Sequence, residues 1–104
     1  MNTLPPNVIR HTVVFRLKHP AHSDAERDFL AAAARLEAIP GVERFEALRQ
    51  VSSKNAYTLG FSMEFADTAA YRAYSEHPAH TQFVQQRWIP EVEEFLEIDY
   101  AQLD

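Results

Sequence analysis

The sequence predicts a single α+β domain in which helices cover one face of a four-stranded antiparallel sheet. Three observations support this fold class. Four segments have the length and composition of strands, two regions carry helix-start signals followed by apolar residues at helical spacing, and the segment order is strand, helix, strand, strand, broken helix, strand. A chain of 104 residues can form one hydrophobic core, so a single domain is expected.

Residues 8–18 predict the first strand because apolar and polar residues alternate along it. One face of this strand is apolar except for a histidine, and it carries Ile9, His11, Val13, Phe15 and Leu17. A lone histidine on such a face is either a core residue bonded to a nearby polar group or a residue of a cavity.

The first helix is predicted to begin at about Asp24. Ser23 and Glu26 have the spacing of a capping box, in which each side chain accepts from the backbone N–H of the other residue. Its apolar stripe consists of Phe29, Leu30, Ala33, Leu36 and Ile39. The stretch 39–42, IPGV, ends the helix, because proline disfavours helix at the preceding residue and glycine permits a turn.

Residues 43–51 and 56–65 predict a pair of strands joined by a turn at 52–55. Asp67 is a suitable N-cap for a second helix over 68–76. Pro78 interrupts that helix and suits the first turn of a third one, expected from about Ala79 to Ile89. Pro90 ends the third helix, and residues 94–101 predict the last strand.

The βαββαβ order predicts a ferredoxin-like fold, with the helices on the more apolar face of the sheet. The other face is mixed, so it would meet either water or a second sheet in a dimer, with Arg10 or Arg16 near acids such as Glu64. In the last strand, the period turns Leu96, Ile98 and Tyr100 toward the core. Glu97 and Asp99 would then point away from the helices.

Composition narrows the class of protein. The net charge of −5 gives no basic stripe for nucleic acid, and the absence of cysteine excludes disulfides and thiolate chemistry. No apolar run reaches membrane-spanning length, and a cytoplasmic location is expected. Residues 1–7 are expected to be a flexible segment before a single domain at 8–104.

The tetrapeptide HPAH occurs at 19–22 and again at 77–80, in contexts that share nothing else, so an internal repeat is not indicated. His19 and His22 are predicted to be solvated loop residues. In the second copy, His77 is predicted to cap the third helix and His80 to lie in its first turn. A helix N-terminus disfavours an imidazolium, so His80 would stay neutral and able to act as a base.

Several segments together resemble the Dabb family, the stress-responsive dimeric α/β-barrel domain. They are IRHTVVFRLK, IPGV, YTLGFSMEF, AYRAYSEHPAH and FLEIDY, in this order over residues 9–100. The resemblance implies a homodimer in which two sheets pack into a barrel, which would cover the mixed sheet face.

One enzymatic member of the family is a plant polyketide cyclase that closes a linear tetraketide by aldol condensation without a cofactor. The resemblance implies that His80 and Tyr74 are catalytic and that His11, His77 and Asp99 belong to the substrate site. Such a site needs Asp99 to face His80, against the period noted above, and a bulge in an edge strand would reconcile the two. The expected apolar lining of the cavity is Val13, Phe15, Phe29, Phe61 and Met63.

Two functions therefore stay open. The first is a cofactor-independent cyclase or lyase acting on a β-polyketone-like substrate, with His80 as base and Tyr74 as donor to an enolate oxygen. The second is a non-catalytic homodimer that protects against stress or binds a small apolar or aromatic ligand. A metal or haem site is disfavoured because no histidine pair has i, i+4 spacing, and no nucleic-acid or membrane partner is expected.

Overall fold

The computed structural model describes residues 4–103, so the predicted N-terminal segment at 1–7 falls partly outside the described residues. The strands are β1 (Ile9–Leu17), β2 (Glu43–Arg49), β3 (Leu59–Phe65) and β4 (Val92–Tyr100). The helices are α1 (Asp24–Ala34), the 3₁₀ turn η1 (Arg35–Ala38), α2 (Thr68–Glu76), α3 (Pro78–Phe83), the π-helical turn η2 (Val84–Trp88) and α4 (Ile89–Glu91). The predicted element order is confirmed.

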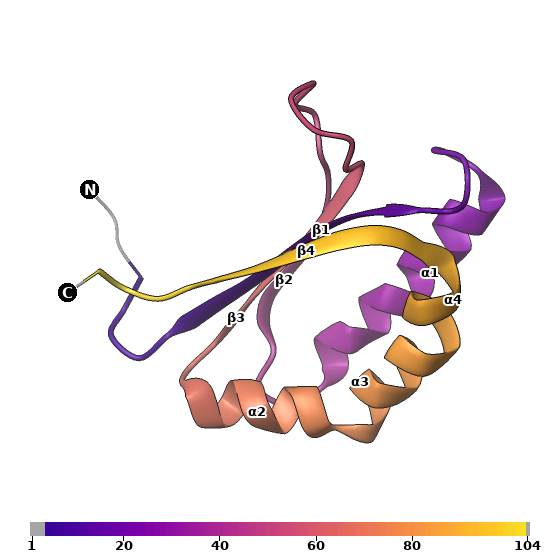
Figure 1. Ribbon diagram of the computed structural model, residues 1–104. Coiled ribbons are helices and arrows are strands. Elements are labelled where there is room, and N and C mark those ends of the chain that lie inside the picture. Colours follow the sequence, from indigo (N-terminus) through magenta and orange to yellow (C-terminus); the bar gives the residue numbers. More distant parts are fainter. Residues whose placement is uncertain (1–3, 104) are drawn as a thin grey trace.

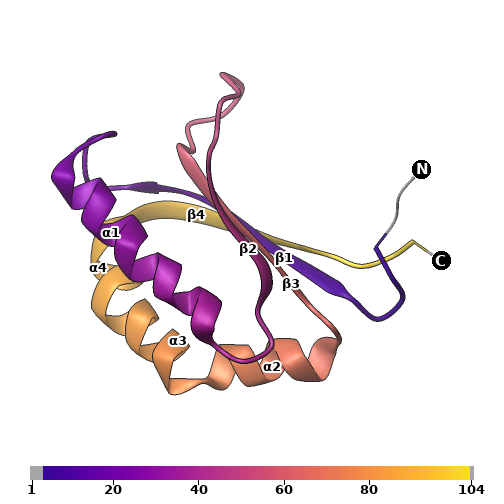
Figure 2. The same cartoon turned by 180° about the vertical axis from the view of Figure 1, so that it is seen from behind.

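The four strands form one antiparallel sheet in the order β2-β3-β1-β4, which is the ferredoxin-like arrangement. The helices lie on one side of this sheet and leave its other face uncovered (Figure 1). Figure 2, seen from behind, shows α1 running beside α3 on that same side. Their contact is made by Phe29 and Phe83, whose ring centroids lie 5.5 Å apart.

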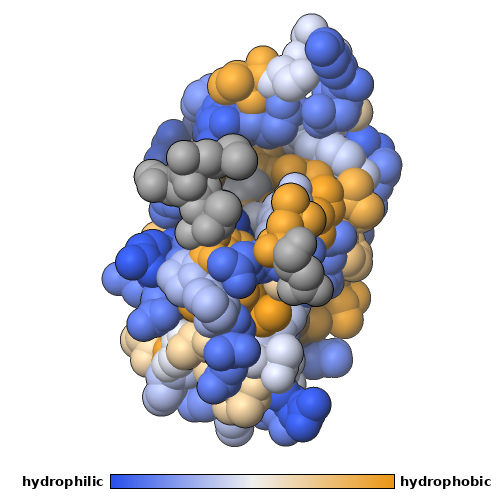
Figure 3. All heavy atoms as spheres, turned by 90° about the vertical axis from the view of Figure 1, so that its left-hand side faces the viewer, coloured by the Kyte–Doolittle hydropathy of each residue, from blue (hydrophilic) through white to orange (hydrophobic). Residues whose placement is uncertain are grey.

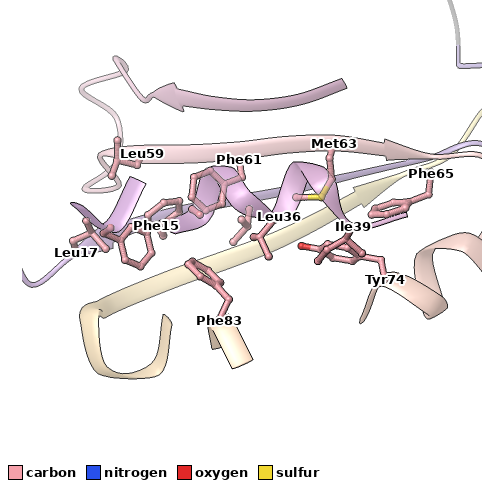
Figure 4. Packing of buried hydrophobic residues seen from close by; sticks show 13 residues of the cluster. Phe15, Leu17, Leu36, Ile39, Leu59, Phe61, Met63, Phe65, Tyr74 and Phe83 are labelled. Carbon is pink, nitrogen blue, oxygen red and sulfur yellow. The ribbon is translucent and has the colours of Figure 1, made fainter. Parts of the chain in front are cut away.

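The core fills the layer between the sheet and the helices. The inward faces of β1 and β3 meet the apolar stripe of α1 there, as Figure 4 shows. Phe15, Phe29, Met63 and Phe65 are its largest fully buried side chains. The predicted inward faces of these strands and of α1 are confirmed. The apolar residues at alternate positions of each strand are buried together with those at helical spacing along α1.

The start of α1 is stabilised by a cap and by a buried ion pair. The Ser23 hydroxyl accepts from the Glu26 amide at 3.1 Å, which confirms half of the predicted capping box. The other half is wrong, because the Glu26 carboxylate accepts from the His22 amide and from Arg49 of β2, at 2.6 Å for the latter. The Arg49 guanidinium lowers the pKa of Glu26 below its ordinary value, against the effect of burial.

Replacing Glu26 with alanine is expected to lower the free energy of unfolding by about 1–3 kcal/mol at neutral pH, because Arg49 loses a charged, buried hydrogen-bond partner. A carboxylate with a lowered pKa stabilises the fold above its unfolded pKa and ceases to do so on acidification. The difference in the free energy of unfolding between the wild type and the variant should therefore shrink as the pH falls below 4.5. Urea unfolding at several pH values measures it. Asp24→Ala, which removes an exposed carboxylate, should change little.

The period-based prediction for the faces of β4 is wrong, and the bulge that the family resemblance required is present. Leu96, Ile98 and Tyr100 point to the uncovered face, with exposed fractions of 49%, 38% and 50%. Glu97 and Asp99 lie on the inward face, opposite Val13 and His11 of β1. The cause is a bulge near the start of the strand: Arg16 pairs with Glu94 but Leu17 pairs with Val92, which leaves Glu93 as an extra residue.

The uncovered face of the sheet is mixed in character, as predicted. Its polar part includes Glu64, which is only 8% exposed and is bound by Arg10 at 3.1 Å and by Arg44 at 2.9 Å. Its apolar part follows β4. Figure 3 shows hydrophobic residues gathered on the β4 side of this view and hydrophilic ones opposite. The ion pairs of this face are thus formed within one chain.

Candidate functional site

A cavity of about 340 Å³ lies between the inward face of the sheet and the second helical region. This volume is at the lower end of what small-molecule sites usually have. Its wall is mostly apolar and aromatic, with a few polar groups. The lining residues are His11, Val13, Leu36, Phe61, Met63, Tyr74, His80, Phe83, Val84, Trp88, Ile89, Phe95 and Glu97.

The second HPAH motif places His80 on this wall. The chain breaks between α2 and α3 at His77, whose Nδ1 accepts from the Ala79 amide, so the predicted cap is confirmed. The His80 Nδ1–H donates to the Ser75 carbonyl at 3.0 Å, which leaves Nε2 as the unprotonated atom of the neutral ring. Burial lowers the pKa of His80. The ring is thus neutral at neutral pH and available as a base.

Tyr74 is the second polar group of the site. It is buried on α2, and its ring centroid lies 4.5 Å from that of His80. Figure 4 shows its hydroxyl directed away from α2 and into the cluster near Leu36. Burial raises the pKa of Tyr74 well above its ordinary value, so the hydroxyl keeps its proton and can donate it in a hydrogen bond.

His11 belongs to a hydrogen-bonded group of three side chains. Its Nδ1 lies 2.6 Å from Asp99 Oδ1, and the Tyr71 hydroxyl donates to the other carboxylate oxygen at 2.9 Å. Because a carboxylate accepts only, Nδ1 carries the proton and the Nε2 of a neutral ring is left as an acceptor. The Asp99 carboxylate therefore fixes the orientation of the His11 imidazole, and His11 lines the cavity.

Of the residues predicted for the site, the structure gathers His11, Val13, Phe61, Met63, Tyr74 and His80 on the cavity wall. Asp99 is present through its bond to His11. Phe15 and Phe29 pack in the core beside the cavity, and His77 caps α3 instead of lining it.

Sequence reasoning missed two polar residues of the site. Tyr71 is one of them, and the available signal is its position three residues before Tyr74, which places both tyrosines on nearly the same helix face. Glu97 is the other, because an unbroken alternation along the last strand predicts that its side chain points away from the helices. The apolar lining residues that were missed come from three places. Leu36 lies on η1 and Phe95 on β4, while Phe83, Val84, Trp88 and Ile89 lie in or beside the π-helical turn. In that turn the backbone N–H of Ile89 bonds to the Val84 carbonyl, and such turns are frequent at functional sites.

The first HPAH copy lies outside the cavity wall. His22 is exposed, as predicted. His19 is not a solvated loop residue, because its Nε2 lies 2.7 Å from the Glu91 carboxylate and its side chain is 28% exposed. This contact connects the loop after β1 with α4.

Replacing His19 and His22 together with alanine is expected to leave the affinity for any cavity ligand unchanged. The free energy of unfolding should fall by at most about 1 kcal/mol, from the loss of one partly exposed pair. Titration of a bound ligand by NMR and urea unfolding measure both quantities. A clear loss of ligand affinity would show that the first copy contributes to binding.

The described residues contain no group of three or more histidine, cysteine or acidic side chains that could hold a metal ion. In residues 4–103, no helix is both long and apolar enough to cross a membrane.

The order of the elements and the antiparallel sheet define the class of protein, which is a ferredoxin-like α+β domain. The model of the stress-responsive A/B barrel domain family, Dabb, matches residues 9–102. The chain belongs to this family. No curated protein matches it.

Solved structures agree with this assignment. A Dabb family protein with a ferredoxin-like fold from Mesorhizobium loti is 60% identical, covers 93% of this chain and 98% of its own, and superposes with a TM-score of 0.91. Hydroxynitrile lyase from Passiflora edulis shares 18% identity over 96% of each chain, with a TM-score of 0.82. A dimeric ferredoxin-like protein of unknown function from Thermobifida fusca shares 21% identity over 92% of each chain, with a TM-score of 0.77. The last two are similar in fold alone.

Proposed function

We propose that this Dabb domain is a cofactor-independent acid–base enzyme that acts on a small, largely apolar carbonyl compound. One observation carries the proposal. A neutral His80 and a protonated Tyr74 lie with ring centroids 4.5 Å apart on the wall of one apolar cavity. A base and a hydrogen-bond donor so placed are what an enolisation step needs.

In the proposed reaction, His80 Nε2 removes a proton from the carbon next to a carbonyl group. Negative charge then develops on the carbonyl oxygen, and the Tyr74 hydroxyl donates a hydrogen bond to it. His11, held by Asp99 and Tyr71, orients the substrate through its free Nε2. When the enolate carbon attacks a second carbonyl of the same molecule, a C–C bond forms, the new alkoxide takes the proton from the His80 imidazolium, and the result is an aldol ring closure, as in a polyketide cyclase.

A relative of the same fold supports an enzymatic role. The Passiflora edulis protein with this fold is a hydroxynitrile lyase. The fold therefore accommodates catalysis in at least one member. For the present chain, the substrate class follows from the cavity itself, whose size and apolar wall suit a β-polyketone or an aryl ketone.

Deuterium exchange tests the proposal without knowledge of the natural substrate. The protein is incubated in D₂O with 4-phenylbutan-2-one and related ketones, and loss of the α-proton signals is followed by NMR. Wild-type protein should accelerate exchange beyond buffer and beyond an equal amount of an unrelated protein. Ketones that bind without accelerated exchange would leave the alternative, a non-catalytic ligand-binding or stress-protective domain.

The protonation of His80 gives an independent prediction. Burial lowers the pKa of His80, so the folded protein favours the neutral ring and the charged ring becomes the main form only at a pH below the ordinary histidine pKa. An NMR titration of the ring carbons should show a midpoint below that of a model histidine peptide, and exchange activity should fall through the same midpoint as the pH decreases. A His80 that titrates like the model peptide would count against a buried base.

We also propose that the chain forms a homodimer through the uncovered sheet face. Leu96, Ile98 and Tyr100 expose apolar surface there in a row along β4. Exposed apolar patches of this kind are typical of interfaces, and an antiparallel sheet commonly buries only one face within its own chain. Relatives of this fold from Thermobifida fusca and Bacteroides fragilis are described as dimeric.

A further inference from the structure

Glu97 is a charged residue on the cavity wall for which the proposed chemistry has no use. It lies on β4, beyond the bulge and opposite Val13, with its side chain on the inward face. The other ionisable groups on the wall are His11, His80 and Tyr74. Among the lining residues of the described chain there is no lysine or arginine, so no permanent positive charge balances the Glu97 carboxylate inside the cavity.

The Glu97 charge reaches the reactive groups of the site. Burial raises the pKa of Tyr74, and the negative charge of Glu97 raises it further. The same charge adds to the effects of burial and of Asp99 on Tyr71. A ligand that contacts Tyr74 therefore also experiences the field of Glu97, because both residues line the same space.

We infer that Glu97 is a specificity-determining residue, which makes the cavity accept uncharged or cationic ligands and reject carboxylates. The inference rests on the proposed function and names the substrate class of that site. Substrates would enter as ketones, esters, thioesters or amides. A free carboxylic acid, ionised at neutral pH, would be repelled.

The physical basis is the lack of a compensating cation. A carboxylate that leaves water needs a charged or multiply hydrogen-bonded partner. His80 does not supply a positive charge, since burial keeps it neutral. The Asp99 carboxylate accepts from His11 and from Tyr71, so it offers no donor to an incoming carboxylate either. Glu97 keeps part of its side chain in water, so the repulsion between it and a second carboxylate is screened, and it should lower the affinity by about tenfold relative to a neutral ligand.

Two probes of nearly equal shape test this inference. Binding of 4-ethylbenzamide and of 4-ethylbenzoate at pH 7.5 is measured by NMR chemical-shift titration of the labelled protein. The proteins compared are wild type, Glu97→Gln and Glu37→Gln. Glu37 is exposed on η1 and does not line the cavity, so its substitution removes one negative charge without changing the wall.

Wild type and Glu37→Gln should bind the amide about tenfold more tightly than the carboxylate. In Glu97→Gln, the affinity for the carboxylate should rise by about the same factor, while that for the amide stays constant. Equal affinities in the wild type, or a preference that Glu97→Gln leaves intact, would overturn the inference. These binding measurements test the role of Glu97 alone. The deuterium-exchange experiment tests the proposed function, so the failure of one can be told from the failure of the other. If neither probe binds, the cavity does not take such ligands and this inference fails.

Discussion

His80→Ala is expected to reduce the rate of α-deuterium exchange by about 10²–10⁴-fold while the protein stays folded. The loss is that of a general base at the reacting carbon. The fold should survive because the His80 side chain is only partly buried and the cap of α3 comes from His77. Circular dichroism and urea unfolding confirm folding before exchange rates are compared.

Tyr74→Phe provides the companion measurement. It keeps the buried ring, and with it the packing against Phe65 and His80, but removes the donor to the enolate oxygen. The exchange rate should fall by about 10²-fold or more, as for the loss of one oxyanion donor. If both variants exchange protons as fast as the wild type, any catalysis by this protein occurs elsewhere.

Ile98→Asp is expected to convert the proposed homodimer into a monomer. Sedimentation of the wild type at micromolar concentration is expected to show a species of twice the 11.9 kDa chain mass, and the variant a species of the chain mass itself. Each dimer would lose two buried isoleucines and gain two desolvated charges, which weakens association by about 10³-fold or more.

The matched control is Val51→Asp, which places the same charge on an apolar residue of the loop before β3 that is 91% exposed. It should leave the sedimentation coefficient unchanged. A wild type that sediments as a monomer, or an Ile98→Asp variant that remains a dimer, would show that this face is not the interface.

Much of the fold could be predicted because it depends on local signals. The helix at 68–76 has a capping aspartate before it and a proline after it, and its bounds agree with the structure. The inward faces of β1 and β3 follow from a period that no irregularity disturbs. In both cases a few neighbouring residues determine the conformation, so the sequence alone is sufficient.

The face of β4 could not be predicted from its alternation, because both of its sides carry apolar residues and its register depends on pairing with β1. Only the family resemblance indicated a bulge there. The extra residue Glu93 reverses the alternation, and no residue type marks that bulge in the sequence. The part played by Tyr71 escaped prediction for a related reason. Its bond to Asp99 joins residues 28 positions apart, which become neighbours only when β4 lies in this register.

The bulge at Glu93 has a consequence for how such a protein can change. The pairs on either side of it, Leu17 with Val92 and Arg16 with Glu94, are those of a regular ladder, so Glu93 is the one residue here that the pairing does not use. Loss of its codon would straighten the strand, while Leu96, Ile98 and Tyr100 would keep the outward side and Glu97 and Asp99 the inward side. The length of the chain can therefore change by one residue at this point without exchanging the two surfaces of β4. Evolution could lose or regain this residue while the polar wall and the apolar outer row both stay in place.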